Sequence, residues 1–299
     1  MKSAKTHIYI FTAVAVITAV FILVVVSIEN KKNSKSENAA EEIASGWNQF
    51  RTGEYNQALK IFGKVLTGVP EKSEYRVQAL YGLGCTQWLK LPYADKPAAE
   101  IIFKDIITRF PNSDYAIWSM FALVRMKHIV PSGEIPDYPA LRKSYQEIYD
   151  KFPNHIAGQE AFIYLIETYL AAFTKEDAEL AKTKLGEFLK KHPDSSFIGT
   201  AWGLNAKACE VLGMKQNQLD SMIKGLEKKE IDPTNPRMEN STDYWSIAVV
   251  AEFEVGDFDT ARKYYRLLMS EYPRDRRNFG AKTAIERMDA LEEKLRREN

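Results

Sequence analysis

Residues 256–273 read GDFDTARKYYRLLMSEYP, and the pattern of this stretch recurs at residues 53–70, GEYNQALKIFGKVLTGVP. In each stretch an alanine, an aromatic residue and an aliphatic residue stand twelve, eight and five places before the final proline. Spacings of four and then three place these side chains on one face of a helix, and proline stops a helix. Both stretches therefore predict an amphipathic helix that ends at a proline.

The same proline-terminated helix recurs along most of the chain. Six prolines divide residues 45–275 into blocks of 40 to 42 residues: Pro70, Pro111, Pro153, Pro193, Pro233 and Pro273. The three marked places carry apolar or aromatic residues in every block except the fifth, which has Ser221, Gly225 and Lys228. We predict one helical hairpin in each block. First helices are expected near residues 40–51, 74–90, 113–129, 155–173, 196–212 and 240–254, and second helices near residues 55–67, 95–109, 137–151, 176–191, 215–229 and 257–271.

The two quoted stretches resemble the second half of a tetratricopeptide repeat, in which a small residue packs two helices together, an aromatic residue fills the next gap and proline ends the unit. The usual period is about 34 residues, so we expect longer first helices and loops here. The resemblance implies an all-α fold, a right-handed solenoid of about six hairpins over residues 41–273. A capping helix is expected at residues 274–299, where Ala284, Met288, Leu291 and Leu295 form an apolar stripe that would cover the last repeat.

The block junctions carry a second resemblance. The sequences FPNSDYA at 110–116, FPN at 152–154 and HPDSSF at 192–197 each precede a predicted first helix, which their Asn, Asp or Ser can cap. Such junctions are similar to those of bacterial envelope repeat proteins, including the outer-membrane assembly lipoproteins and the Tol-Pal cell-division coordinator. A lipoprotein signal is excluded because the first cysteine is Cys85.

An uncharged apolar segment precedes the repeats at residues 8–28. As a helix it reaches about 30 Å, the hydrocarbon thickness of a bilayer, so we expect a transmembrane helix between a short basic tail at 1–7 and a flexible linker at 29–40. A cleaved signal peptide is the alternative, but its apolar region would run to about 7–15 residues. Lysines flank both ends, so charge hardly decides the orientation. The junction resemblance favours the bacterial inner membrane, with the repeats on the periplasmic side.

Charge and motifs exclude several classes of function. Removing the five Lys and two Glu of residues 1–38 from the totals of 41 and 40 leaves 36 basic and 38 acidic side chains, so the body has no bulk charge that favours nucleic acid. No phosphate-binding loop, nucleophile elbow or zinc-ligand spacing occurs. We predict no catalytic, cofactor-binding or metal-binding residues, and hence no enzyme.

The histidines and cysteines fit this interpretation. The four histidines are scattered, and we expect them to be solvated or to cap helices. Cys85 and Cys209 lie three repeats apart, whereas repeat proteins contact only neighbouring units, so a disulfide between them is not expected. We predict two buried free thiols.

Aromatic residues of the predicted first helices indicate a binding surface. In a tetratricopeptide superhelix these helices line the inner surface, and amphipathic rings are common anchors for peptides. The same rings also fill the gaps between stacked hairpins, so core packing stays an open alternative for each. We expect Trp202 and Trp245 in a peptide-binding groove, because the polar residues Asn205 and Asp243 lie near them, and Trp118 is a further candidate.

These observations favour a non-catalytic, membrane-anchored scaffold or adaptor that mediates protein–protein interactions in the cell envelope. The expected partners are protein or peptide segments and, through residues 8–28, the lipid bilayer. Self-association through a solenoid edge or the span is also open. The alternative function is a translocon-associated, chaperone-like periplasmic subunit that binds unfolded exported chains.

Overall fold

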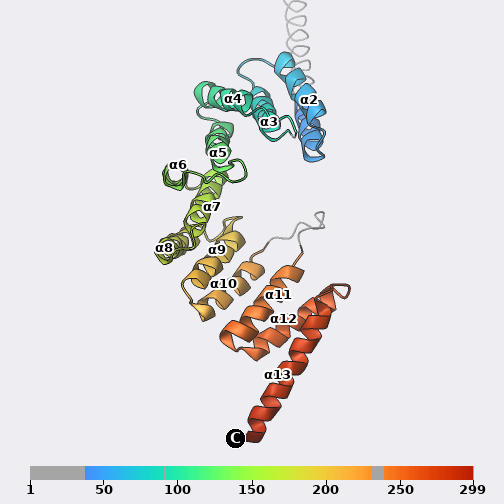
Figure 1. The fold of residues 1–299 in the computed structure, drawn as a ribbon. Coiled ribbons are helices and arrows are strands. Elements are labelled where there is room, and N and C mark those ends of the chain that lie inside the picture. Colours follow the sequence, from blue (N-terminus) through green and yellow to red (C-terminus); the bar gives the residue numbers. More distant parts are fainter. Residues whose placement is uncertain (1–37, 91, 230–238, 299) are drawn as a thin grey trace, which may run out of the picture. The chain divides into compact units, whose positions relative to one another are not determined.

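The computed structural model describes residues 38–90, 92–229 and 239–298, and every regular element within them is a helix. The chain divides into two compact units, residues 1–134 and 135–299, which Figure 1 colours from blue to red along the sequence. The boundary falls within the third block, in the loop before residue 138. The predicted tail and membrane span at 1–28 and most of the linker lie outside the described residues. None of the helices in the described ranges is long and apolar enough to cross a membrane.

The helices of the hairpins alternate as predicted, with bounds within three residues of those expected when Ser241–Val255 is taken as one helical segment. The capping helix begins at Asn278, four residues later than expected. The first unit contains a helix whose described part covers residues 38–51, then α2 (Tyr55–Gly68), α3 (Glu74–Leu89), α4 (Lys96–Arg109) and α5 (Asp114–His128). The second unit contains α6 (Tyr138–Lys151), α7 (Ile156–Leu170), α8 (Lys175–Lys191), α9 (Ile198–Val211), α10 (Lys215–Glu227), α11 (Ser241–Val249), the π-helical η1 (Val250–Val255), α12 (Phe258–Glu271) and α13 (Asn278–Glu298). The all-helical prediction is confirmed. The handedness and continuity of one solenoid over 41–273 stay predictions.

The three marked places of the blocks form the core of each unit. Those of the first unit are Ala58, Phe62, Val65, Ala99, Phe103 and Ile106, and those of the second are Leu141, Tyr145, Ile148, Ala181, Leu185, Phe188, Ala261, Tyr265 and Leu268; all are buried. In the fifth block Ser221 is also buried, but Gly225 is only half-buried and Lys228 is exposed. The fifth block therefore keeps the helices while its packing surface is made of smaller side chains.

The ring of Phe62 lies between glycines of two first helices. A Cβ added to Gly46 would lie 2.7 Å from Phe62 Cε1, and one added to Gly82 would lie 2.5 Å from Phe62 Cζ. Gly84 accommodates Phe103 in the same way, at 2.7 Å. The helices can approach this closely because glycine has no side chain. The aromatic residue of the repeat pattern thus fills a gap between helices, as the resemblance implied, and glycines of the first helices provide the space.

Four of the block junctions in the described ranges are closed by the same local backbone hydrogen bond. The residue before the proline accepts a bond from the N–H three places later, over 2.9–3.2 Å, at Phe110, Phe152, His192 and Tyr272. Ser113 Oγ accepts from Ala116 N at the start of α5, at 3.2 Å, as predicted. At the start of α7 the capping group is instead His155 Nδ1, which accepts from Ala157 N at 3.1 Å. The prediction of an Asn, Asp or Ser cap is wrong there, because an imidazole nitrogen takes the same place.

The expectation of a solvated or capping side chain is wrong for His192. Its side chain is buried, with Nε2 3.0 Å from Tyr149 Oη and Nδ1 3.5 Å from Gln159 Nε2. The ring centroid also lies 5.0 Å from that of Phe188. Burial, and then the positive charge of Lys191, lower the pKa of the imidazole. His192 is therefore a core residue that joins α6, α7 and the end of α8.

Both cysteines are buried free thiols, as predicted. Burial raises the pKa of Cys85 to about 12 and also raises the pKa of Cys209. Since the thiolate is the reactive form, neither sulfur is activated for chemistry.

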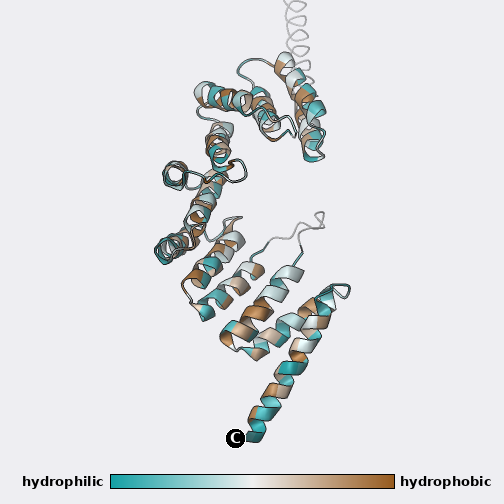
Figure 2. Ribbon diagram, viewed as in Figure 1, coloured by the Kyte–Doolittle hydropathy of each residue, from teal (hydrophilic) through white to brown (hydrophobic). Residues whose placement is uncertain are grey.

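Helix α13 covers the last hairpin through the buried side chains of Ala281, Ala284 and Met288. Arg262 of α12 also binds α13: its Nε lies 2.9 Å from Asp289 Oδ1 and its Nη2 lies 2.8 Å from Glu292 Oε2. The predicted apolar stripe continues to Leu291 and Leu295, which are 44% and 48% exposed. Figure 2 shows the second half of α13 as mostly hydrophilic. The stripe therefore covers the last repeat only over its first half.

Candidate functional site

The five residues predicted for a peptide groove are distributed over both units. Trp118 lies on α5 in the first unit, edge-on to Phe121 with ring centroids 6.1 Å apart. The other four belong to the second unit. Trp245 on α11 is edge-on to Tyr265, 5.5 Å between centroids, and is packed against the hydrophobic cluster that α13 covers. The structure thus places these two tryptophans against neighbouring core rings, and their role in a groove stays a prediction.

Trp202 and Asn205 lie together on α9. They line a small groove of about 280 Å³ beside α8 and α10. Asn205 Nδ2 donates to Ser221 Oγ at 2.8 Å, so its amide links the two helices of its own hairpin. Lys224 Nζ lies 4.6 Å from the centre of the Trp202 ring, a cation–π distance. Lys224 therefore covers one face of the Trp202 ring.

A larger groove, of about 710 Å³, lies between α9, α10 and α11. It is lined by Ser196, Gly199, Thr200, Gly203, Ala206, Lys207, Glu210, Gln218, Met222, Gly225, Leu226, Lys228, Lys229, Asp243, Ser246 and Ile247. Of the five predicted residues only Asp243 is among them. The volume is in the range of ligand-binding clefts, about 300–1,000 Å³.

One wall of this groove is formed by α9, which as far as Ala206 has only small side chains there: Gly199, Thr200, Gly203 and Ala206. Ser196 lies just before the helix, and Lys207 and Glu210 continue the wall toward the other end. The apolar side chains of Met222, Leu226 and Ile247 line the groove from α10 and α11. Gly225 leaves space in this groove, because it stands where the other blocks have a large core residue.

The two glycines of this wall have different surroundings. A Cβ on Gly199 would lie 3.0 Å from the Lys228 carbonyl oxygen, so the close contact of α9 with α10 requires glycine. A Cβ on Gly203 would meet nothing within 4 Å. Glycine inside a helix costs roughly 0.5–1 kcal/mol relative to alanine. Packing within the described residues does not explain why Gly203 has no side chain.

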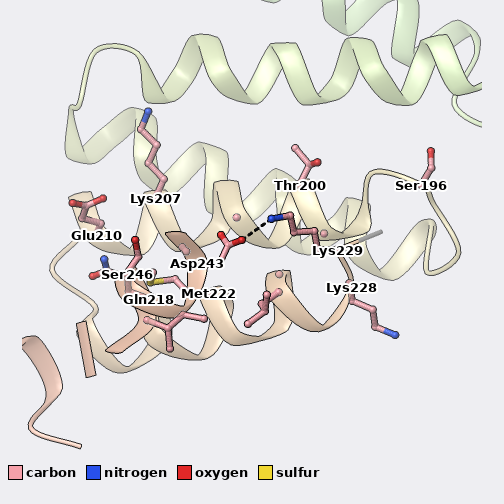
Figure 3. Close-up of a pocket in the computed structure, with 16 residues that line it drawn as sticks. Ser196, Thr200, Lys207, Glu210, Gln218, Met222, Lys228, Lys229, Asp243 and Ser246 are labelled. Carbon is pink, nitrogen blue, oxygen red and sulfur yellow. Dashed lines mark hydrogen bonds and ion pairs between the residues drawn. The ribbon is translucent and has the colours of Figure 1, made fainter. Parts of the chain in front are cut away.

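The polar residues of the groove are unevenly paired. Lys229 Nζ donates to Asp243 Oδ2 at 2.6 Å and to the Glu239 carbonyl oxygen at 2.8 Å, and Figure 3 shows the Lys229–Asp243 pair in the middle of the groove. Lys207 and Glu210 lie toward one end and Lys228 at the other (Figure 3). Lys228 has no ion-pair partner among the described residues. The Lys228 end therefore has an uncompensated positive charge.

Gln218 is the buried polar residue of the groove. Its side chain is 7% exposed, and its Oε1 has no hydrogen-bond partner within the described ranges. A buried amide that lacks a partner costs about 1–3 kcal/mol, and such a group calls for an explanation. The Oε1 atom itself has almost no accessible surface, so it lies beneath the surface of the groove.

The aromatic residues of the first helices do not point to this groove, because none of them lines it. The signal that pointed to it was the fifth block, whose Ser221, Gly225 and Lys228 depart from the repeat pattern. Two of these three residues, Gly225 and Lys228, line the groove. As for metals, the part of the chain that the structure describes contains no cluster of three His, Cys, Asp or Glu side chains suited to hold an ion.

Two solved structures of tetratricopeptide repeat proteins are similar to this chain. PilF of Pseudomonas aeruginosa is 13% identical with a TM-score of 0.52, and the match covers 86% of this chain and 99% of that chain. A chain of the APC/C hetero-tetramer Cut9–Hcn1 is 15% identical with a TM-score of 0.50, over 84% of this chain and 42% of that chain. No protein-family model and no curated protein matches the sequence. At such identities the likeness establishes the fold alone: this chain has the helical-repeat fold of these tetratricopeptide repeat proteins.

Proposed function

We propose that the protein is a non-catalytic scaffold that binds partner proteins through the groove between α9, α10 and α11. The observation that carries this proposal is the groove itself, which combines small side chains on α9 as far as Ala206, apolar residues from α10 and α11 and a polar rim. Apolar pockets with a few convergent polar groups are the usual form of binding sites. Protein partners agree with the tetratricopeptide fold, whose members commonly bind other proteins.

We further propose that residues 8–28 anchor the scaffold in the bacterial inner membrane, with the repeats in the periplasm. The support is the length and apolar character of that segment and the envelope-type junction sequences. Anchoring would keep the groove near partners at the membrane and raise their effective concentration without new contacts. A tag at Asn299 should then be digested by protease in spheroplasts but not in intact cells, and protection in spheroplasts would overturn the periplasmic placement.

Proximity labelling from a fusion at Asn299 tests the scaffold role. We expect a small, reproducible set of envelope proteins to be labelled by the full chain. Gly203→Leu, which fills the groove, should lose these proteins. The matched control is Gly63→Leu in α2, since a Cβ on Gly63 also meets nothing within 4 Å, and this variant should keep them.

Two results would contradict the scaffold proposal. If Gly203→Leu labels the same partners as the unchanged chain, binding does not use the groove. If the labelled proteins are instead a broad range of newly exported chains, the chaperone-like subunit is the better description.

A further inference from the structure

We infer that His192, Gln159 and Ser195 form a proton-sensitive switch at the junction before α9. When the imidazole is protonated, the hydrogen bonds that hold Ser195 must be rebuilt, and the start of α9 loosens. All three residues belong to the second unit. The switch itself does not depend on a binding partner, and only its consequence for the groove rests on the proposed function.

The repeat pattern does not require a histidine before the junction proline. The equivalent residue is Phe110 in the second block, Phe152 in the third and Tyr272 in the sixth. His192 has a ring with two polar nitrogens at this place, although its side chain is only 7% exposed. A phenyl ring would fill the space without needing hydrogen bonds, so the buried imidazole calls for an explanation.

The neighbours of the ring determine which nitrogen carries the proton. Gln159 Nε2 lies 3.5 Å from His192 Nδ1 and donates to the Pro153 carbonyl oxygen at 3.4 Å. Gln159 Oε1 accepts from Ser195 Oγ at 2.7 Å. The amide therefore turns its N–H groups toward Nδ1, which acts as an acceptor. The proton of the neutral ring is then on Nε2, which donates to Tyr149 Oη at 3.0 Å.

A second proton cannot be added to Nδ1 without a change in this network. In the imidazolium both nitrogens are donors, so the N–H at Nδ1 would face the N–H groups of Gln159. Relief requires the amide to turn and to present Oε1 to Nδ1. The turn breaks the bond to Pro153 and removes the acceptor of the Ser195 hydroxyl. The network thus has two discrete arrangements, one for each charge of the ring.

Ser195 connects this network to α9. Its Oγ accepts from Phe197 N at 3.1 Å, and its carbonyl oxygen accepts from Ile198 N at 3.0 Å. Phe197 is the N-cap residue of α9 and makes no capping hydrogen bond through its own side chain. A change at the Ser195 hydroxyl therefore acts directly on the first turn of α9.

The charges near the ring favour its neutral form at pH 7. Burial, and then the positive charge of Lys191 on α8, lower the pKa of His192. Asp194 of the junction is exposed and forms no ion pair with the imidazole in the described structure. A protonated ring therefore has no counter-ion in place, and the two arrangements exchange below pH 6.5, the ordinary pKa of histidine.

The helices packed against the ring present neutral groups to it. From α6 it meets the hydroxyl of Tyr149, whose pKa is raised by burial and then by the charges of Asp150 and Glu187. From α7 it meets the uncharged amide of Gln159. The phenol stays neutral over the range in which histidine titrates, so the imidazole is the group that changes charge.

The junction borders the candidate groove. Ser196 lines the groove and lies at one end of it (Figure 3), and Gly199 and Thr200 continue the same wall along α9. Loosening the start of α9 would move this wall, so partners held in the groove would be released in acid.

Histidine NMR of the full chain in detergent tests the charge change. With nitrogen-15-labelled histidine, His192 should show the Nε2–H tautomer at pH 7.5 and should gain its second proton below pH 6.5. His192→Phe identifies the signal by its loss. An Nδ1–H tautomer at pH 7.5, or a ring that stays neutral down to pH 5, would overturn the inference.

A spin label at the junction tests the structural response. It is attached after Ser196→Cys, because Ser196 is exposed whereas Cys85 and Cys209 are buried. The mobile fraction of its spectrum should rise several-fold on acidification, with the midpoint of the His192 titration. In a His192→Phe background, which restores the ring of the equivalent junctions, mobility should not depend on pH. Equal responses in both backgrounds, or a label that stays immobile while His192 titrates, would refute the switch.

Gln159→Glu gives a test with the opposite sign. A carboxylate beside Nδ1 should move the midpoint of the His192 titration up by about 1–3 pH units. It can accept from both the imidazolium and Ser195 Oγ, so the label should stay immobile in acid although the ring is charged. Circular dichroism checks that the variant is folded. Acid mobility equal to that of the unchanged amide would contradict the role given to Gln159.

Proximity labelling at pH 7 and pH 5.5 separates the switch from the proposed function. The fusion at Asn299 should lose its partners at pH 5.5, and the same fusion with His192→Phe should keep them. If the spin label responds to pH but the partners do not, the switch stands and its consequence for the groove is wrong. If labelling does not depend on Gly203 at either pH, the proposed function falls while the NMR and spin-label results still decide the switch.

Discussion

Replacing Gly82 with alanine should destabilise the first unit although alanine is the better helix former. A Cβ at this position would lie 2.5, 2.6 and 2.7 Å from three carbons of the Phe62 ring. The ring cannot move away, because Phe62 is fully buried and Gly46 packs against it as well. A Cβ added to Gly46 would lie 2.7 Å from Phe62 Cε1. The added methyl group must therefore be accommodated by a shift of the backbone.

The expected size follows from two opposing effects. Overpacking a core costs about 1–3 kcal/mol, and the upper half of that range applies because three ring atoms are contacted at once. Alanine is about 1 kcal/mol more favourable than glycine inside a helix, which offsets part of this cost. The net loss should be about 1–2 kcal/mol, which lowers the Tm of a domain of about 100 residues by roughly 5–15 °C.

Thermal unfolding of the full chain, followed by circular dichroism and by the fluorescence of Trp47, is the assay. The Trp47 ring lies 5.4 Å from that of Phe62, so its emission should report on the same packing. Gly63→Ala, which meets no neighbour, is the control and should raise the stability by up to about 1 kcal/mol. In a Phe62→Leu background, Gly82→Ala should cost at least about 0.5 kcal/mol less. A stabilising Gly82→Ala, or additive effects in this cycle, would refute the argument.

Three further variants test other parts of the fold. Phe173 has a φ of 54°, where a large side chain is strained, so Phe173→Gly should raise the stability by up to about 1 kcal/mol in a thermal melt; a lower Tm would contradict this. The folded-state pKa of His192 lies below its usual value of 6.5, so its stabilising effect is complete above that pH and is lost as the pH falls through the lowered pKa; urea titrations at pH 7 and 5 should show this loss, and His192→Gln should reduce it. Glu252 is buried, bonded to Arg287 and to Tyr265 Oη, so Glu252→Gln should speed hydrogen exchange in α13, whereas unchanged exchange would show that this pair does not hold the capping helix.

Most of the fold of each unit could be predicted from spacing alone. An alanine, an aromatic and an aliphatic residue at intervals of four and three, followed by proline, define a helix face and a helix end without any tertiary information. The residues that this rule named, such as Ala58 and Phe103, are fully buried. The division of the chain at residues 134 and 135 could not be predicted in this way, because the periodic pattern runs through it.

The candidate site was harder to predict. Trp202 and Trp245 were sound candidates as amphipathic rings, yet whether a ring faces a core or a groove depends on which helix packs beside it. Asp243 was chosen for its nearness to a tryptophan and lines the large groove for another reason, its ion pair with Lys229. The open space beside Gly203 comes from the absence of side chains on two neighbouring helices, and a single sequence gives no direct signal for an absence.

The burial of His192 illustrates the same difficulty on a smaller scale. It stands at the end of a predicted helix, where histidine is usually solvated. Its partners Tyr149 and Gln159 are 43 and 33 residues away in the sequence, so the hydrogen bonds that make burial tolerable could not be anticipated from neighbouring residues.

At the proline junctions the backbone hydrogen bonds are local, so neighbouring blocks depend little on each other for their backbone bonding. The carbonyl before the proline finds its hydrogen-bond donor only three residues later, so a cut at a junction leaves few polar backbone groups stranded on either side. Blocks of about 40 residues could then be duplicated, deleted or transplanted between proteins of this type as whole cassettes. Such rearrangement would lengthen or shorten the array while leaving the interior of every retained hairpin intact.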